Sequence, residues 1–208
     1  MIGELPRNVR EFIVRDLIYI VGGGIVLMSF LYCFDRLPNK DTPVAFYLLG
    51  AGVSYVLGCS LQDLFSIARL VTTAKYPKPN RWVCWMYLRF NNENWKDVPE
   101  FNSSELRPTF RELMKDDLRR AHYERAISGL ILAATMGPCM LVSSLLIFWR
   151  WFSSCSGFDL AIAVTSLFLS IALFALSWLR AAQVTRTDAD ALVDYRATGK
   201  NEDDIGGM

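Results

Sequence analysis

Four stretches of the chain contain no Asp, Glu, Lys, Arg or His, and charged residues crowd between them. The stretches are residues 17–34, 43–62, 126–149 and 160–179, each 18 to 24 residues long. An α-helix rises ~1.5 Å per residue, so about 20 apolar residues cross ~30 Å of hydrocarbon. A helix on a soluble bundle would show a polar stripe returning every 3.6 residues. The pattern therefore predicts an all-α polytopic membrane protein with four transmembrane helices.

The charged segments set the expected orientation. They are an N-terminal segment (1–16), two short turns (35–42 and 150–159), an insert between the second and third spans (63–125) and a tail (180–208). Lys and Arg number 19 in the N-terminal segment, insert and tail, against 3 in the two turns. Basic residues are retained on the cytoplasmic side. We therefore expect a multi-pass protein of the plasma (inner) membrane, with both ends and the insert in the cytoplasm.

The insert is expected to be largely helical. Residues 63–74 should continue the second span as a helix, and 75–80 are rich in turn-forming residues. Apolar positions at helical spacing predict one long helix from about Phe110 through the third span, with a cytoplasmic stalk. The last residues, 199–208, are polar, and we expect them to be disordered.

Aromatic residues cluster in the insert, and five of them are candidates for docking a partner: Trp82, Trp85, Tyr87, Phe90 and Trp95. Trp, Tyr and Arg dominate the energetics of protein interfaces, so this cluster is a possible binding surface for a cytoplasmic protein. Two other interpretations stay open. The rings could form a small core against the stalk helix, or they could lie at the lipid interface.

Small residues recur at every fourth position in two spans. Helices in lipid associate where small side chains allow close backbone approach. The predicted helix-packing positions are Gly50, Ser54 and Gly58 in the second span and Gly129, Ala133 and Gly137 in the third. Packing within one protomer accounts for them. A homo-oligomer is also expected because four helices make a small bundle; the sequence gives no subunit number, and a tetramer is a guess.

Two further groups have one structural and one functional interpretation. Arg119, Arg120 and Arg125, next to the third span, are candidates for binding anionic lipid headgroups, or they only anchor the topology. Cys33 and Cys155 fall at the predicted outer face, where an oxidising exterior would let them form a disulfide; the alternative is two free thiols.

Residues for catalysis are not apparent. The one histidine, His122, stands without Cys-x-x-Cys or His-x-x-x-His spacing, whereas a metal site needs several converging ligands. We expect no enzymatic activity, no catalytic or metal-binding residues, no cofactor and no direct binding of nucleic acid. The spans lack the ionisable residues that mark ion-coupled carriers. A pore lined by hydroxyls stays open, and its candidate residues are Thr135, Ser143, Ser144, Thr165, Ser166 and Ser170.

In outline, the chain resembles the small four-span membrane subunits of bacterial anti-phage defence systems, such as the membrane component of Kiwa. The resemblance lies in the span count, the cytoplasmic termini and the insert between spans two and three; it involves no diagnostic motif and assigns no functional residue. It implies a homo-oligomeric membrane scaffold that senses envelope disturbance and holds a cytoplasmic effector. The alternative function is a pore-forming effector that permeabilises the bilayer when triggered.

Overall fold

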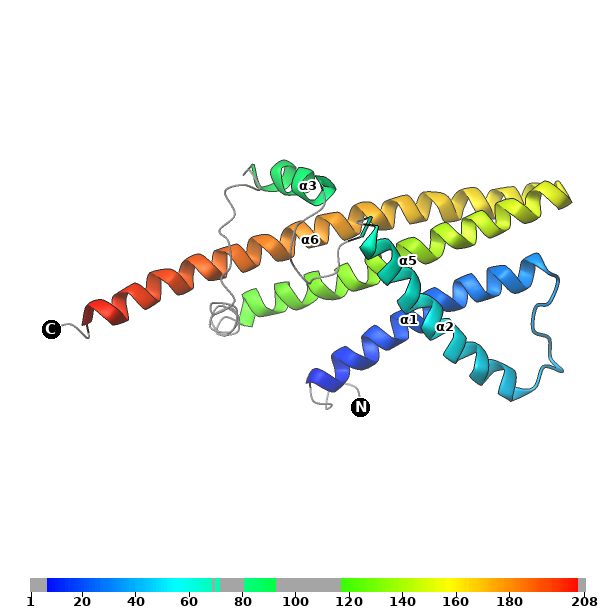
Figure 1. Ribbon diagram of the computed structural model, residues 1–208, viewed down its shortest axis with the longest axis horizontal. Coiled ribbons are helices and arrows are strands. Elements are labelled where there is room, and N and C mark those ends of the chain that lie inside the picture. The colour runs from blue at the N-terminus through cyan, green and yellow to red at the C-terminus, as the bar shows by residue number, and fades with distance from the viewer. Residues whose placement is uncertain (1–6, 69, 72–80, 93–116, 206–208) are drawn as a thin grey trace. The chain divides into compact units, whose positions relative to one another are not determined.

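The protein is all-helical in the part that the structure describes. The computed structural model describes residues 7–68, 70–71, 81–92 and 117–205, with side chains at 13–68, 70–71, 83–89, 92 and 117–197. Within these ranges the chain forms five helices and no strand (Figure 1). The helices are α1 (Arg7–Cys33), α2 (Val44–Ile67), α3 (Arg81–Asn91), α5 (Asp117–Ser154) and α6 (Gly157–Ile205).

Four of the helices, α1, α2, α5 and α6, are long and apolar enough to cross a membrane. The prediction of an all-α protein with four helices that can span a membrane is therefore confirmed for the described residues. Helix α3, with 11 residues, is too short to cross ~30 Å of hydrocarbon.

Local backbone geometry explains where the spans end. Asp35, just after α1, has φ 53°, and Cys155, between α5 and α6, has φ 50°. A residue in the left-handed region ends a helix because its N–H turns back to the last carbonyls. Pro43 directly precedes α2 with φ −60°, and proline is tolerated at a helix start, where its missing N–H is not needed.

Helices α5 and α6 are longer than a span requires. α5 has 38 residues and contains Pro138, and α6 has 49 residues. From Asp117 onward, α5 is the single long helix that the sequence predicts; residues 110–116 lie outside the described part.

One local prediction is correct only in part, and another is wrong. The second span continues as a helix beyond Gln62, but only to Ile67, where α2 ends; Ala68 forms its C-cap, and Leu70 and Val71 are not helical. Residues 72–74 lie outside the described part. α6 runs to Ile205, so residues 199–205 are helical instead of disordered. The residues before Gly199 already form a long helix, and extending an existing helix costs far less than starting one.

The chain divides into two compact units. The first contains residues 1–73 and 131–177, and the second contains 74–130 and 178–208. The first unit therefore holds α1, α2 and most of the apolar length of α5 and α6. The second holds α3, the beginning of α5 and the end of α6.

In the first unit, α1 and α2 cross at small residues (Figure 1). A methyl group added to Gly23 would overlap the backbone of Ser54 and Gly58, and one added to Gly58 would overlap the backbone of Tyr19. Next to the crossing, the rings of Tyr19 and Tyr55 meet edge to face, with centroids 5.7 Å apart. The two helices can touch backbone to backbone only because these positions lack side chains.

Candidate functional site

The small residues predicted for helix packing lie at helix contacts of several kinds. Ser54 and Gly58 are buried at the α1–α2 crossing, and Gly50 lies near Leu27 of α1. In α5, Ala133 and Gly137 are buried, and a methyl group on Gly137 would lie 3.5 Å from the Phe174 ring of α6.

Gly129 differs from the other small positions because the side chain next to it is charged. A methyl group there would stand 3.2 Å from Nε of Arg180. The Arg180 Nη1 donates to Oε1 of Gln183 at 2.9 Å. Gly129 therefore makes room for a charged side chain in the second unit.

Hydroxyl groups join α5 to α6 within the first unit. Ser144 Oγ donates to the carbonyl of Ala163 at 2.8 Å, and Ser170 Oγ donates to the carbonyl of Gly137 at 2.8 Å. Hydrogen bonds of this kind hold helices together in lipid, where unsatisfied polar groups are costly.

The other candidate pore hydroxyls do not form one exposed lining. Thr135 and Ser143 are buried. Thr165 is exposed and donates to Ala161 of its own helix at 2.8 Å, and Ser166 is half-buried. Of the six hydroxyls, Ser144 and Ser170 therefore join helices, and Thr165 bonds within its own helix.

A buried amide connects α2 to α5. Gln62 Oε1 accepts a hydrogen bond of 2.9 Å from Oγ1 of Thr135, and both side chains are buried. Thr135 Oγ1 also lies 2.9 Å from the carbonyl of Ile131. This is a link between the two helical hairpins at membrane depth, and sequence reasoning did not single out Gln62.

A polar network of the first unit is centred on Asp159, which is 2% exposed. Its carboxylate accepts hydrogen bonds of 2.7 Å from the hydroxyls of Tyr32 and Ser154, and Nε of Arg150 lies 3.5 Å away. Asp159 lies in the first turn of α6, where the helix dipole also favours negative charge. We call Tyr32, Asp35, Arg150, Ser154 and Asp159 the Asp159 network.

Arg150 connects this network to the end of α1. Its Nη1 donates to Oδ1 of Asp35 at 2.8 Å and to the carbonyl of Tyr32. The guanidinium carbon lies 4.1 Å from the centroid of the Tyr32 ring, a cation–π contact. The network therefore fastens the end of α1 to the α5–α6 turn with ionic, hydrogen-bonding and aromatic contacts.

The sequence contained a signal for this network. Asp35, Arg150 and Asp159 all border the spans on one predicted face of the membrane, and charges at equal depth can meet. Nothing in the pattern says which span ends are neighbours, so the pairing comes from the structure.

The two cysteines considered for a disulfide are not bonded to each other. Both are free thiols in the structure, and Cys33 Sγ donates to the carbonyl of Leu146 at 3.1 Å. Cys33 thus adds one more contact between α1 and α5.

In the second unit, α3 packs on α5 and α6 and divides the aromatic cluster. Val83 and Tyr87 form a core with Leu130, Ala181 and Ala182. Tyr87 is 2% exposed, whereas Trp85 is 54% exposed on the opposite side of α3. Burial removes Tyr87 from the docking candidates.

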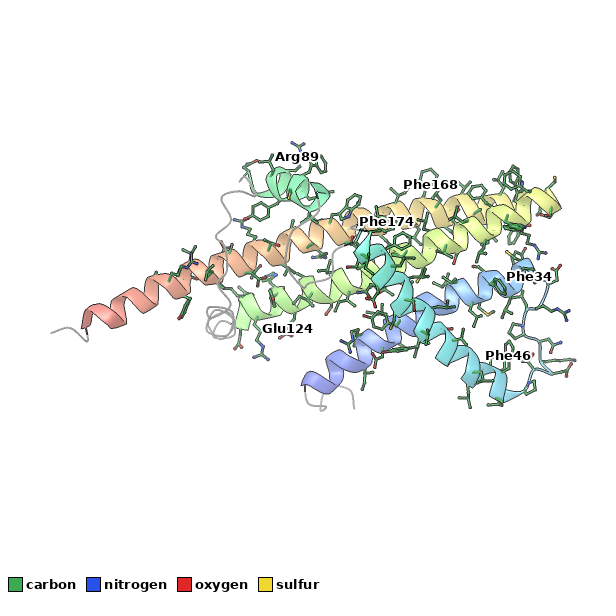
Figure 2. The ribbon with its side chains drawn as sticks, in the orientation of Figure 1. Phe34, Phe46, Arg89, Glu124, Phe168 and Phe174 are labelled. Atoms are coloured by element: carbon green, nitrogen blue, oxygen red, sulfur yellow. The ribbon has the colours of Figure 1, made fainter. Side chains whose placement is uncertain are left out.

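The remaining members of the aromatic cluster are Trp82, Phe90 and Trp95. Trp82 and Phe90 lie in α3, but their side chains are outside the described part, as is the whole of Trp95. Arg89 lies one helical turn after Trp85, and Figure 2 shows it pointing away from α6.

Two of the three arginines considered for lipid headgroups form ion pairs within the chain. Arg119 pairs with Asp194 of α6, and Arg120 lies 3.0 Å from Glu124 in its own helix. Arg125 is exposed. The Arg119–Asp194 pair joins the beginning of α5 to the end of α6 in the second unit.

Beyond Leu179, α6 carries a stripe of exposed residues at helical spacing: Gln183, Arg186, Asp190, Val193 and Ala197. The intervening residues Ala189, Ala191 and Leu192 are buried. A mostly polar stripe beside a buried face is typical of a helix that meets water.

One acidic residue of this segment, Asp188, is half-buried. Desolvation raises the pKa of Asp188 from its ordinary value of 3.8 to about 6, and a hydrogen bond from Tyr123 of α5 opposes part of that rise. Asp188 therefore titrates in the range where most carboxylates are already ionised.

Among the described side chains, no group of three or more His, Cys, Asp or Glu residues is placed to hold a metal ion. No family model, curated protein or solved structure matches the chain. The fold and its contacts define a multi-pass helical membrane protein, and its function has to be inferred from those contacts.

Proposed function

We propose that the protein is a homo-oligomeric scaffold of the plasma (inner) membrane whose second unit lies in the cytoplasm and holds a protein partner there. The observation that carries the proposal is the continuation of α5 and α6 beyond their apolar stretches as helices packed on each other. They share a core with α3, and α6 meets water along one stripe. A prefolded helical platform on a membrane anchor is what a scaffold requires.

The distribution of basic residues supports the orientation. Lys and Arg number 19 in the N-terminal segment, insert and tail, against 3 in the two turns. A reporter enzyme active only in the cytoplasm, fused after Met208, should be active, and one fused within the 35–42 turn should be inactive. The opposite pattern would reverse the orientation and remove the cytoplasmic partner.

The surface proposed for the partner lies beside the Arg119–Asp194 ion pair. Leu118, adjacent to Arg119, is 69% exposed, and Val193, adjacent to Asp194, is 57% exposed. Apolar side chains next to charges with fixed partners are typical of binding surfaces, where the charges provide specificity. The partner would therefore contact both α5 and α6.

The docking test compares two acidic substitutions on the same stripe of α6. Val193→Asp places a charge in the proposed surface, whereas Gln183→Glu adds the same charge elsewhere on the stripe. Both residues are exposed, so folding should be unaffected. The tagged protein is purified in mild detergent from its native host, and the mass of the complex is measured.

We expect a partner in fixed stoichiometry with the wild type and with Gln183→Glu, and at least about a tenfold loss with Val193→Asp, which corresponds to ~1.4 kcal/mol. Equal recovery from both variants would show that the partner binds elsewhere. A complex containing only copies of this chain would contradict the scaffold.

The resemblance to membrane subunits of phage-defence systems suggests the setting in which a partner would act. Deleting the gene should then increase phage plaque formation, and Val193→Asp should reproduce the deletion. In liposomes the purified protein should conduct no ions, and ion flux would favour the pore-forming alternative.

A further inference from the structure

Helix α3 has two apolar faces, and the described part of the second unit covers only one of them. Val83 and Tyr87 point into the core. Trp85 and Leu88 lie on the other side, Leu88 being 49% exposed, and Arg89 beside them is exposed as well. The core does not explain why this 11-residue helix exposes a tryptophan and a leucine.

The residues that α3 packs on indicate its depth relative to the membrane. Leu130 lies inside the charge-free stretch 126–149, and Trp178, packed against the same core, lies inside the stretch 160–179. Ala181 and Ala182 follow directly after Arg180. With the hydrocarbon boundary taken at the ends of the charge-free stretches, and at ~1.5 Å per residue, this core reaches from about 7 Å inside that boundary to about 4 Å outside it.

A surface at this depth that the protein leaves uncovered would meet lipid headgroups. Tryptophan is enriched at this level because its ring is apolar and its N–H is polar, and leucine side chains reach the acyl boundary. An arginine there extends its guanidinium toward the phosphates. The sequence of α3 contains two arginines and no acid, so its charge complements anionic headgroups.

A comparison within the second unit favours lipid over a protein partner at this face. On α6, past Leu179, the exposed stripe includes Arg186 and Asp190, which carry opposite charges and lie 3.9 Å apart. The exposed face of α3 has a tryptophan, a leucine and only positive charge. The stripe on α6, with charges of both signs, is typical of a surface in water. The face of α3, with aromatic, apolar and basic residues, is typical of a surface in a headgroup layer.

We propose that the face of α3 formed by Trp85, Leu88 and Arg89 lies in the lipid headgroup layer and anchors the second unit to the membrane surface. This surface is separate from the one at Leu118 and Val193 that we assign to the protein partner. Anchoring would hold the second unit at the bilayer whether or not a partner is bound.

Photocrosslinking on the full-length protein tests this directly. p-Benzoylphenylalanine replaces Trp85 or Leu88, and the protein is reconstituted in vesicles of phosphatidylethanolamine and phosphatidylglycerol. Replacement of Leu145, exposed within the third span, is the control for lipid contact, and replacement of Asp190 is the control for water. We expect phospholipid adducts, detected by mass spectrometry, at positions 85, 88 and 145 and not at 190.

Absence of lipid adducts at both 85 and 88 would overturn the proposal, as would adducts at these positions formed only with protein. A charge test adds a second readout. Arg89→Glu should lower the adduct yield at position 85 at least about twofold, whereas Arg186→Glu should not. Equal yields from these two variants would show that Arg89 does not contact the headgroups. None of these measurements involves the partner, so the lipid anchor and the scaffold can fail separately.

Discussion

The hydroxyl of Tyr32, at the end of α1, donates a 2.7 Å hydrogen bond to the carboxylate of Asp159, in the first turn of α6. The residues are 127 positions apart in sequence. Arg150 lies against both, since its guanidinium covers the Tyr32 ring and its Nε faces Asp159. The end of α1 is thereby fixed to the beginning of α6 through a buried carboxylate. Removing one of its hydrogen-bond donors should lower the stability of the fold.

Removing this hydroxyl should weaken the first unit. Tyr32→Phe keeps the ring over Arg150 but takes a donor from a buried carboxylate, so we expect a loss of about 1–2 kcal/mol in the free energy of unfolding. The measurement is unfolding by SDS in mixed micelles, followed by circular dichroism. Tyr47→Phe is the matched control, because that exposed hydroxyl makes only a 3.4 Å contact with the carbonyl of Asn39, and it should change stability by less than about 0.5 kcal/mol. Equal stabilities for the two variants would show that the Asp159 network does not hold α1.

Adding a methyl group should separate α1 from α2 at two glycines and not at a third. Gly23→Ala and Gly58→Ala place a carbon against the backbone of the partner helix, whereas Gly52 has nothing within 4 Å of the same position. We expect the first two to cost about 1–3 kcal/mol, and Gly52→Ala to be neutral or to stabilise by up to about 1 kcal/mol through helix propensity. The same SDS titration ranks the three variants. A tolerated Gly58→Ala would mean that the helices do not cross at that residue.

The buried hydrogen bond between Gln62 and Thr135 should contribute modestly to stability. Thr135→Val keeps the shape of the side chain and leaves the Gln62 amide oxygen without this donor. Interhelical hydrogen bonds in membranes average ~0.6 kcal/mol and reach ~1.7 kcal/mol, so a loss of about 1 kcal/mol is expected. Thr165→Val is the control, since Thr165 is exposed and bonds only within its own helix. A double-mutant cycle with Gln62→Leu should give a coupling energy, and additive effects would contradict the bond.

The half-buried carboxyl of Asp188 should make the second unit more stable in mild acid. Its pKa is about 6 in the folded protein and 3.8 ordinarily, so the folded state binds a proton more tightly than the unfolded state. The resulting stabilisation is complete below about pH 4 and is lost as the pH rises through about 6; its size is about 3 kcal/mol. Hydrogen exchange of α6 residues 181–192 should therefore slow as the pH falls from 7.5 to 5, after correction for the intrinsic pH dependence of exchange.

Asp188→Asn provides the control for this titration. The amide keeps a polar group for Tyr123 and carries no charge, so protection at pH 7.5 should rise toward the wild-type value at pH 5 and should not depend on pH over this range. Asp190→Asn, on the exposed stripe, should leave the wild-type pH dependence intact. A persistent pH dependence in Asp188→Asn would assign the titration to another group.

The arrangement within the second unit could be predicted only in part. The alternatives for the aromatic cluster were a docking surface, a core or a lipid interface, and the structure separates its members. Tyr87 enters the core and Trp85 does not. Residues two apart on a helix point in roughly opposite directions, so the division was implicit in the spacing. Which side would be covered depended on α5 and α6, which lie far from α3 in the sequence.

The sequence by itself determined the all-helical class and the four membrane-spanning helices, because the absence of charge over a membrane's thickness is a property of each segment alone. The tertiary structure decided the pairings: Tyr32 with Asp159, Gln62 with Thr135, and Gly23 and Gly58 with the backbone of the crossing helix. It also decided that hydroxyls such as Ser144 and Ser170 join helices and that α6 stays helical to Ile205. The physical reason is that hydrophobic burial in lipid acts on each helix independently, whereas close packing and buried hydrogen bonds depend on which helices become neighbours.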